Sequence, residues 1–329
     1  MKRKLILALI GLLTANAGAE VQIQQPFAYG GWANCVRLSN GRVELVATTD
    51  VGPRVIRFAF VGGSNVFREW PEQVGQTGGD QWRIYGGHRL WHAPENQPRT
   101  YAPDNAPVEA HWDGKTLTLT EPVEPSTGIQ KQMAITLDPE AAHVTVVHRL
   151  TNKNIWGVEL APWAISAMPA GGRAIFPQEP ERPHPEALVP VRTIALWAYT
   201  DMTDPRWTWG RKYIQLRCDP DRPAAQKGGV MNTLGWAAYA EPDLLFLDRF
   251  GFSPNARYPD LGCNVEAYTG GDMLELETFG PLTRVPPNGS VAHVEHWFLY
   301  QLQVGTNEAS IDEKVLPLVR QTEPFKPRL

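Results

Sequence analysis

The chain has 329 residues, with 31 basic and 35 acidic side chains and a formal net charge of −4. This mildly acidic balance, with no basic run beyond the first few residues, argues against nucleic acid or an anionic membrane as a partner. The 29 glycines and 29 prolines divide the chain into short segments, which favours strands and turns over long helices.

The amino terminus has the pattern of an export signal. Lys2-Arg3-Lys4 precedes an apolar run over residues 5–13 that is too short to span a membrane, and small residues follow up to Ala19. We expect cleavage after Ala19 and a periplasmic or secreted mature chain, residues 20–329, with no membrane insertion. The cleavage removes three basic residues and no acidic one, which leaves a net charge of −7.

The three cysteines, Cys35, Cys218 and Cys263, lie far apart in the sequence. Their spacing is not that of a metal site, and an exported protein can form one disulfide from three cysteines with one thiol left over. No dinucleotide or phosphate-binding motif occurs, so we expect no cofactor.

Alternation of apolar and polar residues predicts most of the chain as strands. In chain order the predicted strands are 42–47, 54–60, 115–120, 133–137, 143–150, 157–166, 214–217, 234–240, 244–248, 263–268, 273–278 and 294–303. A proline-rich loop is predicted over 176–190 and one helix over 308–320. The connections are too short for crossover helices, so the fold class is all-β, a single large antiparallel β-sandwich over residues 20–329.

The stretch Tyr85-Gly-Gly-His-Arg-Leu-Trp-His-Ala-Pro-Glu95 has an unusual composition for a core strand. Its side chains that bind ligands or exchange protons are His88, Arg89, Trp91, His92 and Glu95. Two imidazoles, a guanidinium, an indole and a carboxylate within so few residues indicate a polar-ligand site. The alternative is a rigid, well-packed loop whose histidines are structural.

Zinc is a second interpretation of this stretch. His88 and His92 are four residues apart and Glu95 is the nearest third ligand. The metalloprotease pattern is absent, because no glutamate follows the first histidine and the Gly-Gly context is not helical. We therefore assign no metal here.

The carboxyl-terminal third resembles a known superfamily. The matching motifs are Asn264-Val-Glu-Ala-Tyr-Thr-Gly270, Gly271-Asp-Met-Leu-Glu-Leu-Glu-Thr278, Pro286-Pro-Asn-Gly289 and Trp297-Phe298. Their order and spacing resemble the closing strands of the galactose mutarotase-like (aldose 1-epimerase) superfamily, and the whole sequence is similar to a bacterial domain-of-unknown-function group within it. The resemblance extends over residues 36–303 and implies that Glu277 is the catalytic base.

The sequence departs from that superfamily at one position. Mutarotases place an acid histidine where this chain has Trp163. An epimerase reaction would then require His88 or His92 as the acid. The alternative is a chain that binds sugar without epimerising it.

Alternation places several polar side chains on one face of the closing strands. Glu275 and Glu277 share a face opposite the leucines between them, and Asn264 and Glu266 alternate in the same way on the preceding strand. Further candidate sugar contacts are Glu159, Lys212 in the aromatic and basic stretch 204–213, and the indoles of Trp91, Trp163, Trp207 and Trp209. Each of these residues has the simpler interpretation of a solvated strand residue or a core aromatic.

These residues predict a carbohydrate-active protein that takes a mono- or oligosaccharide into a cleft of the sandwich. Whether it is an enzyme stays open between an aldose 1-epimerase-like isomerase and a non-catalytic sugar-binding protein. A polysaccharide lyase or glycoside hydrolase on the same fold is a third possibility.

Overall fold

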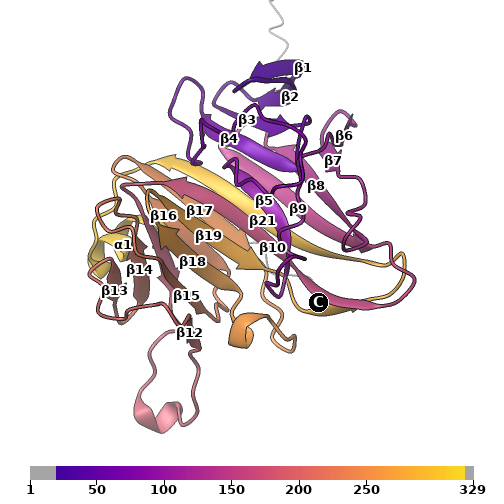
Figure 1. Cartoon of the computed structure of the whole chain (residues 1–329). Helices are drawn as coiled ribbons and strands as arrows, with labels where there is room; N and C mark the ends of the chain where they lie inside the picture. The colour runs from indigo at the N-terminus through magenta and orange to yellow at the C-terminus, as the bar shows by residue number, and fades with distance from the viewer. Residues whose placement is uncertain (1–19, 323–329) are drawn as a thin grey trace, which may run out of the picture.

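The computed structural model describes residues 20–322, so the expected export signal over residues 1–19 lies outside the described part of the chain. The strands form two antiparallel sheets that pack face to face (Figure 1). Within residues 20–322, no helix has the length and apolar character needed to cross a bilayer.

The first sheet has eleven strands. In spatial order it contains β1 (Gln22–Tyr29), β2 (Trp32–Ser39), β3 (Val43–Thr48), β4 (Arg54–Phe60), β5 (His88–Ala93), β10 (Val158–Pro169), β19 (Met273–Phe279), β18 (Val265–Gly270), β15 (Gln226–Val230) and β12 (Ile194–Leu196), and β20 (Thr283–Val285) pairs with β10 outside this order.

The second sheet has ten strands. In spatial order these are β13 (Trp207–Trp209), β14 (Tyr213–Arg217), β11 (Arg173–Pro177), β16 (Trp236–Ala240), β17 (Leu244–Phe250), β21 (Ser290–Gln301), β9 (His143–Asn152), β8 (Ile129–Leu137), β7 (Leu117–Thr120) and β6 (Glu109–Trp112). Its outer face is partly covered by α1 (Glu308–Lys314) and α2 (Leu316–Gln321). Two short 3-10 turns, η1 (His184–Glu186) and η2 (Asp260–Gly262), lie in loops.

The main core fills the space between the two sheets. Leu274 and Leu276 of β19 enter this core, whereas the residues between them face the other way. The predicted antiparallel β-sandwich is confirmed, and the predicted carboxyl-terminal helix is present as α1 and α2. Cys35, Cys218 and Cys263 are buried and unpaired in this structure, so the disulfide that the sequence permitted is not formed.

The stretch Tyr85–Glu95 contains a buried core strand, although its composition is unusual for one. Six of its residues form β5, which lies between β4 and β10 inside the first sheet, and all six are buried. The mixed composition arises because the two faces of β5 meet different surroundings. One face packs on the main core, and the other belongs to a separate aromatic cluster built around Trp91 and Trp163.

Gly87 has a clear steric role at the start of β5. Its φ of +72° is a left-handed conformation, and a Cβ at this position would lie 2.4 Å from the carbonyl oxygen of Val55 on β4. We expect Gly87→Ala to lower the free energy of unfolding by about 3 kcal/mol or more, because backbone strain and overpacking add.

Gly78→Ala is the matched control for this change. Gly78 also has a left-handed φ, of +66°, but has open space around the Cβ position. Gly78→Ala should therefore lower the free energy of unfolding only by the backbone strain, ~1–2 kcal/mol. Urea unfolding of the two variants measures the difference, and equal losses would contradict the close approach of β4 and β5 as the cause.

Candidate functional site

The candidate site lies on the face of the first sheet that is turned away from the main core. Antiparallel pairing aligns Arg89, Ile165, Glu277 and Glu266 in one row across β5, β10, β19 and β18. Because directly paired residues point to the same side of a sheet, these side chains share one face. The predicted common face for Glu266, Glu275 and Glu277 is thus present in the structure.

Glu277 is the centre of the site and has no solvent-exposed surface. Its Oε2 accepts hydrogen bonds from the indole Nε1 of Trp163 at 2.9 Å and from Nζ of Lys227 at 3.0 Å. Its Oε1 has no hydrogen-bond partner among residues 20–322. One oxygen of Glu277 is therefore held in place, and the other is a buried acceptor that no residue of the described chain uses.

Lys227 connects Glu277 to a second buried carboxyl group. Its Nζ lies 3.0 Å from Oε2 of Glu266, which is directly opposite Glu277 on the neighbouring strand. This contact is an ion pair, and neither oxygen of Glu266 has a hydrogen-bond partner within the described chain. Two carboxyl groups and one ammonium thus form a compact charged group, the Glu277–Lys227–Glu266 triad.

Burial sets the protonation of this triad. It raises the pKa of Glu277 to about 7, against the attraction of Lys227. Burial also raises the pKa of Glu266 well above its ordinary value, and the charge of Glu277 adds to that rise. For Lys227, burial alone would lower the pKa, but the two carboxylates raise it well above its usual value. The triad therefore contains one ammonium and two carboxyl groups whose pKa values are both raised by burial.

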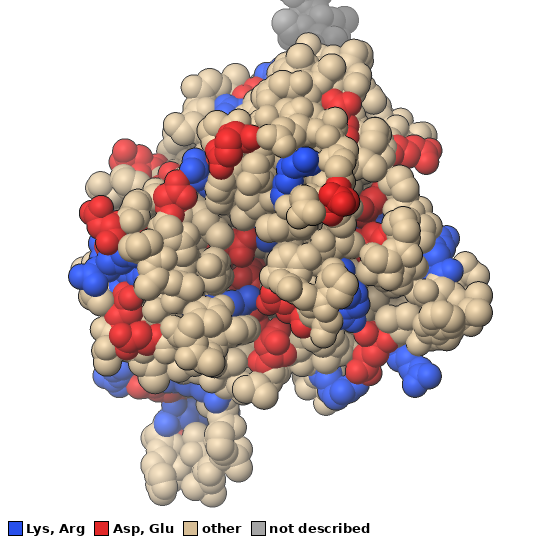
Figure 2. Space-filling model, in the orientation of Figure 1, with Lys and Arg blue, Asp and Glu red and all other residues tan. Residues whose placement is uncertain are grey.

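Aromatic side chains surround the triad. The ammonium of Lys227 lies 4.9 Å from the ring centre of Trp163 and 4.7 Å from that of Trp197, which favours its charged form. Trp197 is half-buried, and Tyr199 beside it is exposed. Figure 2 shows acidic and basic side chains together in a hollow on this face, over β10 and β19. The arrangement offers flat apolar walls around a polar floor.

Arg89 and Trp91 extend the site along β5. The Nη2 of Arg89 donates to Glu275 at 2.7 Å, and the guanidinium lies 4.6 Å from the ring centre of Trp91. The Nε and Nη1 atoms of Arg89 are buried and have no partner in the described part of the chain. Trp91 packs edge-on against Trp163, with ring centres 5.3 Å apart. Arg89 can therefore donate two further hydrogen bonds to a bound ligand.

The two histidines of β5 do not face this site. Alternation along the strand turns Arg89 and Trp91 toward Glu277, and it turns His88 and His92 toward the second sheet. His88 Nε2 lies 2.7 Å from Nε2 of His148 on β9, and His92 is 3.3 Å from a carboxylate oxygen of Glu124. The sheet itself separates both imidazoles from Glu277, which corrects their assignment as the acid.

Among the other predicted contacts, only Glu95 lies at the site. It accepts a hydrogen bond from Tyr101 at 2.5 Å, and Tyr101 packs against Trp91. Glu159 shares the face but lies four residues from Trp163, ~13 Å along the strand, and pairs with Arg257 at the surface.

Four further predicted residues contact other parts of the protein instead of the site. Asn264 is buried and exchanges hydrogen bonds with the backbone of Asn232. Lys212 is exposed beside β14 and pairs with Asp312 of α1. Trp207 and Trp209 stack on each other in β13 of the second sheet, and Trp207 joins the main core.

Lys227 was missed by the sequence prediction. It precedes a Gly-Gly pair in Gln226-Lys-Gly-Gly-Val230, a stretch without clear alternation. The structure explains one of these glycines, since a Cβ on Gly229 would lie 2.8 Å from Cγ of Glu266. The only sequence signal for Lys227 was its position next to two glycines, one of which, Gly229, leaves room for the side chain of Glu266.

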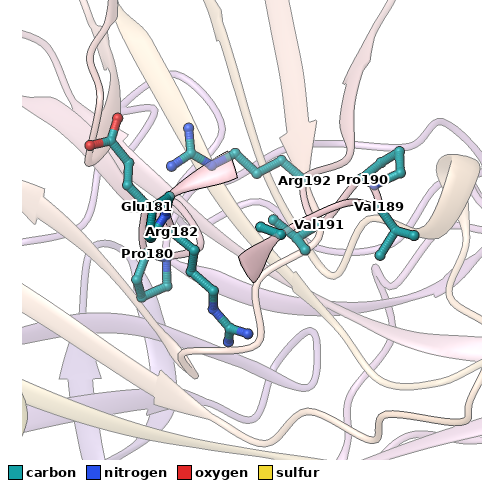
Figure 3. Close-up of a pocket in the computed structure, with 9 residues that line it drawn as sticks. Pro180, Glu181, Arg182, Val189, Pro190, Val191 and Arg192 are labelled. Atoms are coloured by element: carbon teal, nitrogen blue, oxygen red, sulfur yellow. The ribbon is translucent and has the colours of Figure 1, made fainter. Parts of the chain in front are cut away.

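A concavity of about 780 Å³ lies elsewhere on the described chain. It is lined by residues of the loop that joins β11 to β12, including Pro180, Arg182, Val189 and Arg192 (Figure 3). This loop projects from the body of the molecule in Figure 1. The concavity is thus the inside of one loop, and its lining contains none of the residues of the triad.

Comparison with known proteins identifies the fold. No family model matches the chain. A galactose mutarotase-like protein from Lactobacillus casei ATCC 334 superposes with a TM-score of 0.52 at 10% identity, over 81% of this chain and 100% of that chain. A candidate aldose 1-epimerase from Klebsiella pneumoniae subsp. pneumoniae MGH 78578 gives 0.55 at 10% identity, over 92% and 87%.

A larger protein also contains this fold. A TPR-domain containing protein from Parabacteroides distasonis ATCC 8503 superposes with a TM-score of 0.57 at 17% identity over 83% of this chain. The chain spans about half of that protein's length, 49%. These similarities show the galactose mutarotase-like β-sandwich that the carboxyl-terminal motifs predicted.

Proposed function

We propose that the protein binds a sugar over the Glu277–Lys227–Glu266 triad and accelerates exchange between its anomers. The observation that carries this proposal is Glu277, a fully buried carboxyl group bonded to the indole of Trp163, one oxygen of which has no hydrogen-bond partner among residues 20–322. Sugar rings stack their C–H faces on indoles and present hydroxyls to carboxylates and guanidinium groups. Two structural neighbours, a galactose mutarotase-like protein and a candidate aldose 1-epimerase, agree with this substrate class.

The triad contains an acid and a base for this reaction. Ionised Glu277 takes the proton of the anomeric hydroxyl, and protonated Glu266 gives a proton to the ring oxygen as the bond from that oxygen to C1 breaks. Rotation about C1–C2 and the reverse transfers close the ring as the other anomer. Two carboxyl groups whose pKa values are raised to different extents suit such complementary roles. The charge of Lys227 stabilises whichever carboxylate is ionised.

A second candidate function is sugar binding without catalysis. The observation that favours it is Trp163, whose indole takes the place of the histidine expected from the resemblance and holds Glu277 Oε2. The same aromatic walls and Arg89 serve both functions. Export, with cleavage after Ala19, is part of our proposal and rests on the amino-terminal sequence alone.

A two-stage experiment tests the function. Thermal stabilisation by a panel of mono- and oligosaccharides identifies ligands, because a ligand that binds only the folded state raises the melting temperature. Anomeric proton exchange by NMR then compares the rate for the tightest ligand with its spontaneous rate. Acceleration supports the isomerase, binding without acceleration supports the second function, and no binding of any sugar contradicts both.

The pH dependence of the exchange rate follows from Glu277. Its base form increases as the pH rises through about 7, so the rate should be ~10-fold higher at pH 8 than at pH 6. The rate is measured at saturating sugar over this range and corrected for the spontaneous reaction. A profile already flat from pH 5 upward would contradict a base with a raised pKa.

A further inference from the structure

A second group of ionisable side chains lies between the two sheets, on the opposite side of the first sheet from the triad. It consists of His88 on β5, His148 on β9 and Glu295 on β21, all of them buried. His88 Nε2 and His148 Nε2 are 2.7 Å apart, and they lie 3.7 Å and 3.9 Å from Oε2 of Glu295. The proposed sugar chemistry uses none of these groups.

The outer nitrogen of each imidazole is already oriented by a neighbour. His148 Nδ1 faces the carbonyl oxygen of His293 at 3.3 Å, and His88 Nδ1 faces the hydroxyl oxygen of Ser166 at 2.9 Å. A carbonyl only accepts, so Nδ1 of His148 carries the proton and its Nε2 presents a lone pair. Both imidazoles are fully buried.

Glu295 is oriented in the same way. Its Oε2 accepts a hydrogen bond from the indole of Trp297 at 2.9 Å, and its Oε1 accepts one from the hydroxyl of Thr278. Asp248 lies beside it as a second buried carboxyl group. Protein metal sites hold their ligands by such outer hydrogen bonds.

The three inner atoms fit the bond lengths of a metal ion. A point equidistant from the two Nε2 atoms and the Glu295 oxygen lies about 2 Å from each, and zinc binds imidazole nitrogen and carboxylate oxygen at ~2.0–2.2 Å. We propose that His88, His148 and Glu295 bind one divalent transition-metal ion of the zinc class. Two imidazoles with one carboxylate are a ligand set that zinc uses with a water molecule as the fourth ligand.

The ion would have a structural role. His88 belongs to the first sheet, and His148 and Glu295 belong to the second, so a shared ion joins the two layers. His88 also immediately precedes Arg89 on β5, which links the metal site to the position of the sugar site. In a metal-free protein, His88 instead moves its proton to Nε2, donates it to His148 and accepts a hydrogen bond from Ser166.

Metal content of tag-free protein tests the proposal. Because the site is fully buried, the protein is unfolded in chelator and refolded with zinc or cobalt, and excess ion is then removed. We expect about one equivalent of bound metal, cobalt absorption bands of a nitrogen and oxygen site, and a melting temperature ~5 °C or more above that of the metal-free protein.

His148→Asn is the informative variant. Its amide nitrogen can replace Nδ1 as donor to the carbonyl of His293, while the inner ligand atom is lost. Bound metal should fall below about a tenth of an equivalent. His184→Asn, at an exposed histidine in the projecting loop, is the matched control and should keep the full equivalent.

The proposal does not depend on the variant folding. If His148→Asn fails to fold, the metal content of Glu295→Gln and the cobalt spectrum of the wild-type protein test the proposal in its place. Refolded wild-type protein without bound metal and without a shift in melting temperature would overturn the proposal. A folded His148→Asn variant that still binds one equivalent of metal would also overturn the proposal.

Discussion

Replacing Glu277 by Gln is expected to reduce accelerated anomer exchange by ~10²–10⁴-fold, which is the contribution of a positioned general base. The amide keeps the size of the side chain and an oxygen that can accept from Trp163, but it cannot take the proton of the anomeric hydroxyl. Sugar affinity should fall by no more than one charged hydrogen bond, ~1.5–3 kcal/mol. Anomeric proton exchange at saturating sugar and calorimetric titration measure the two effects separately.

Glu159→Gln is the control for this experiment. Glu159 lies on the same face of β10, half exposed and paired with Arg257, but away from the triad. It should leave the exchange rate and the affinity unchanged. If Glu277→Gln retained the wild-type acceleration, Glu277 would not be the base. If wild type itself showed no acceleration with a sugar that it binds, the protein would be a binder.

The second large effect is expected from Lys227→Met, which removes the cation between two buried carboxyl groups. Breaking a buried ion pair by deleting one partner typically costs about 3–5 kcal/mol of stability, because the remaining charge has no compensation. The side chain of Lys227 is only 5% exposed, so water cannot replace the lost interaction. Urea unfolding at pH 7 measures the loss.

A double variant separates charge from packing in this result. Glu277→Gln in the Lys227→Met background removes the carboxylate whose charge Lys227 compensates and should restore part of the lost stability. Lys212→Met is the surface control, since its pair with Asp312 is 57% exposed on the lysine side and should contribute no more than about 1 kcal/mol. Equal losses from Lys227→Met alone and from the double variant would contradict a charge-based explanation.

The exchange rate of Lys227→Met alone also bears on the mechanism. Loss of Lys227 removes the attraction that lowers the pKa of Glu277, so the pH midpoint of any remaining exchange should move above 7. Glu266→Gln alone removes the proposed acid. A Glu266→Gln variant that is stable but does not accelerate exchange would support the assignment of Glu266 as the acid.

The sequence by itself determined the all-β class and much of the polar face of the site. Strict alternation in Leu274-Glu-Leu-Glu277 requires both glutamates to lie opposite the leucines, whatever the remaining chain does. The motifs of the last strands predicted the mutarotase-like fold through their resemblance to a known superfamily, because the order and spacing of motifs can be compared from sequence alone. The helix near the carboxyl end was likewise predicted from local pattern, since residues three and four apart share a helical face.

Only the tertiary structure decided which face of β5 meets the site. Arg89 and His88 are neighbours in the sequence, and alternation states only that they point to opposite sides of a strand. The pairing of β5 with β10 directs Arg89 toward Glu277 and His88 into the core. Lys227 reaches Glu277 across 50 residues of chain, from a strand with no amphipathic pattern. Its role depends on the register of β15, β18 and β19, which long-range packing fixes and which local sequence does not encode.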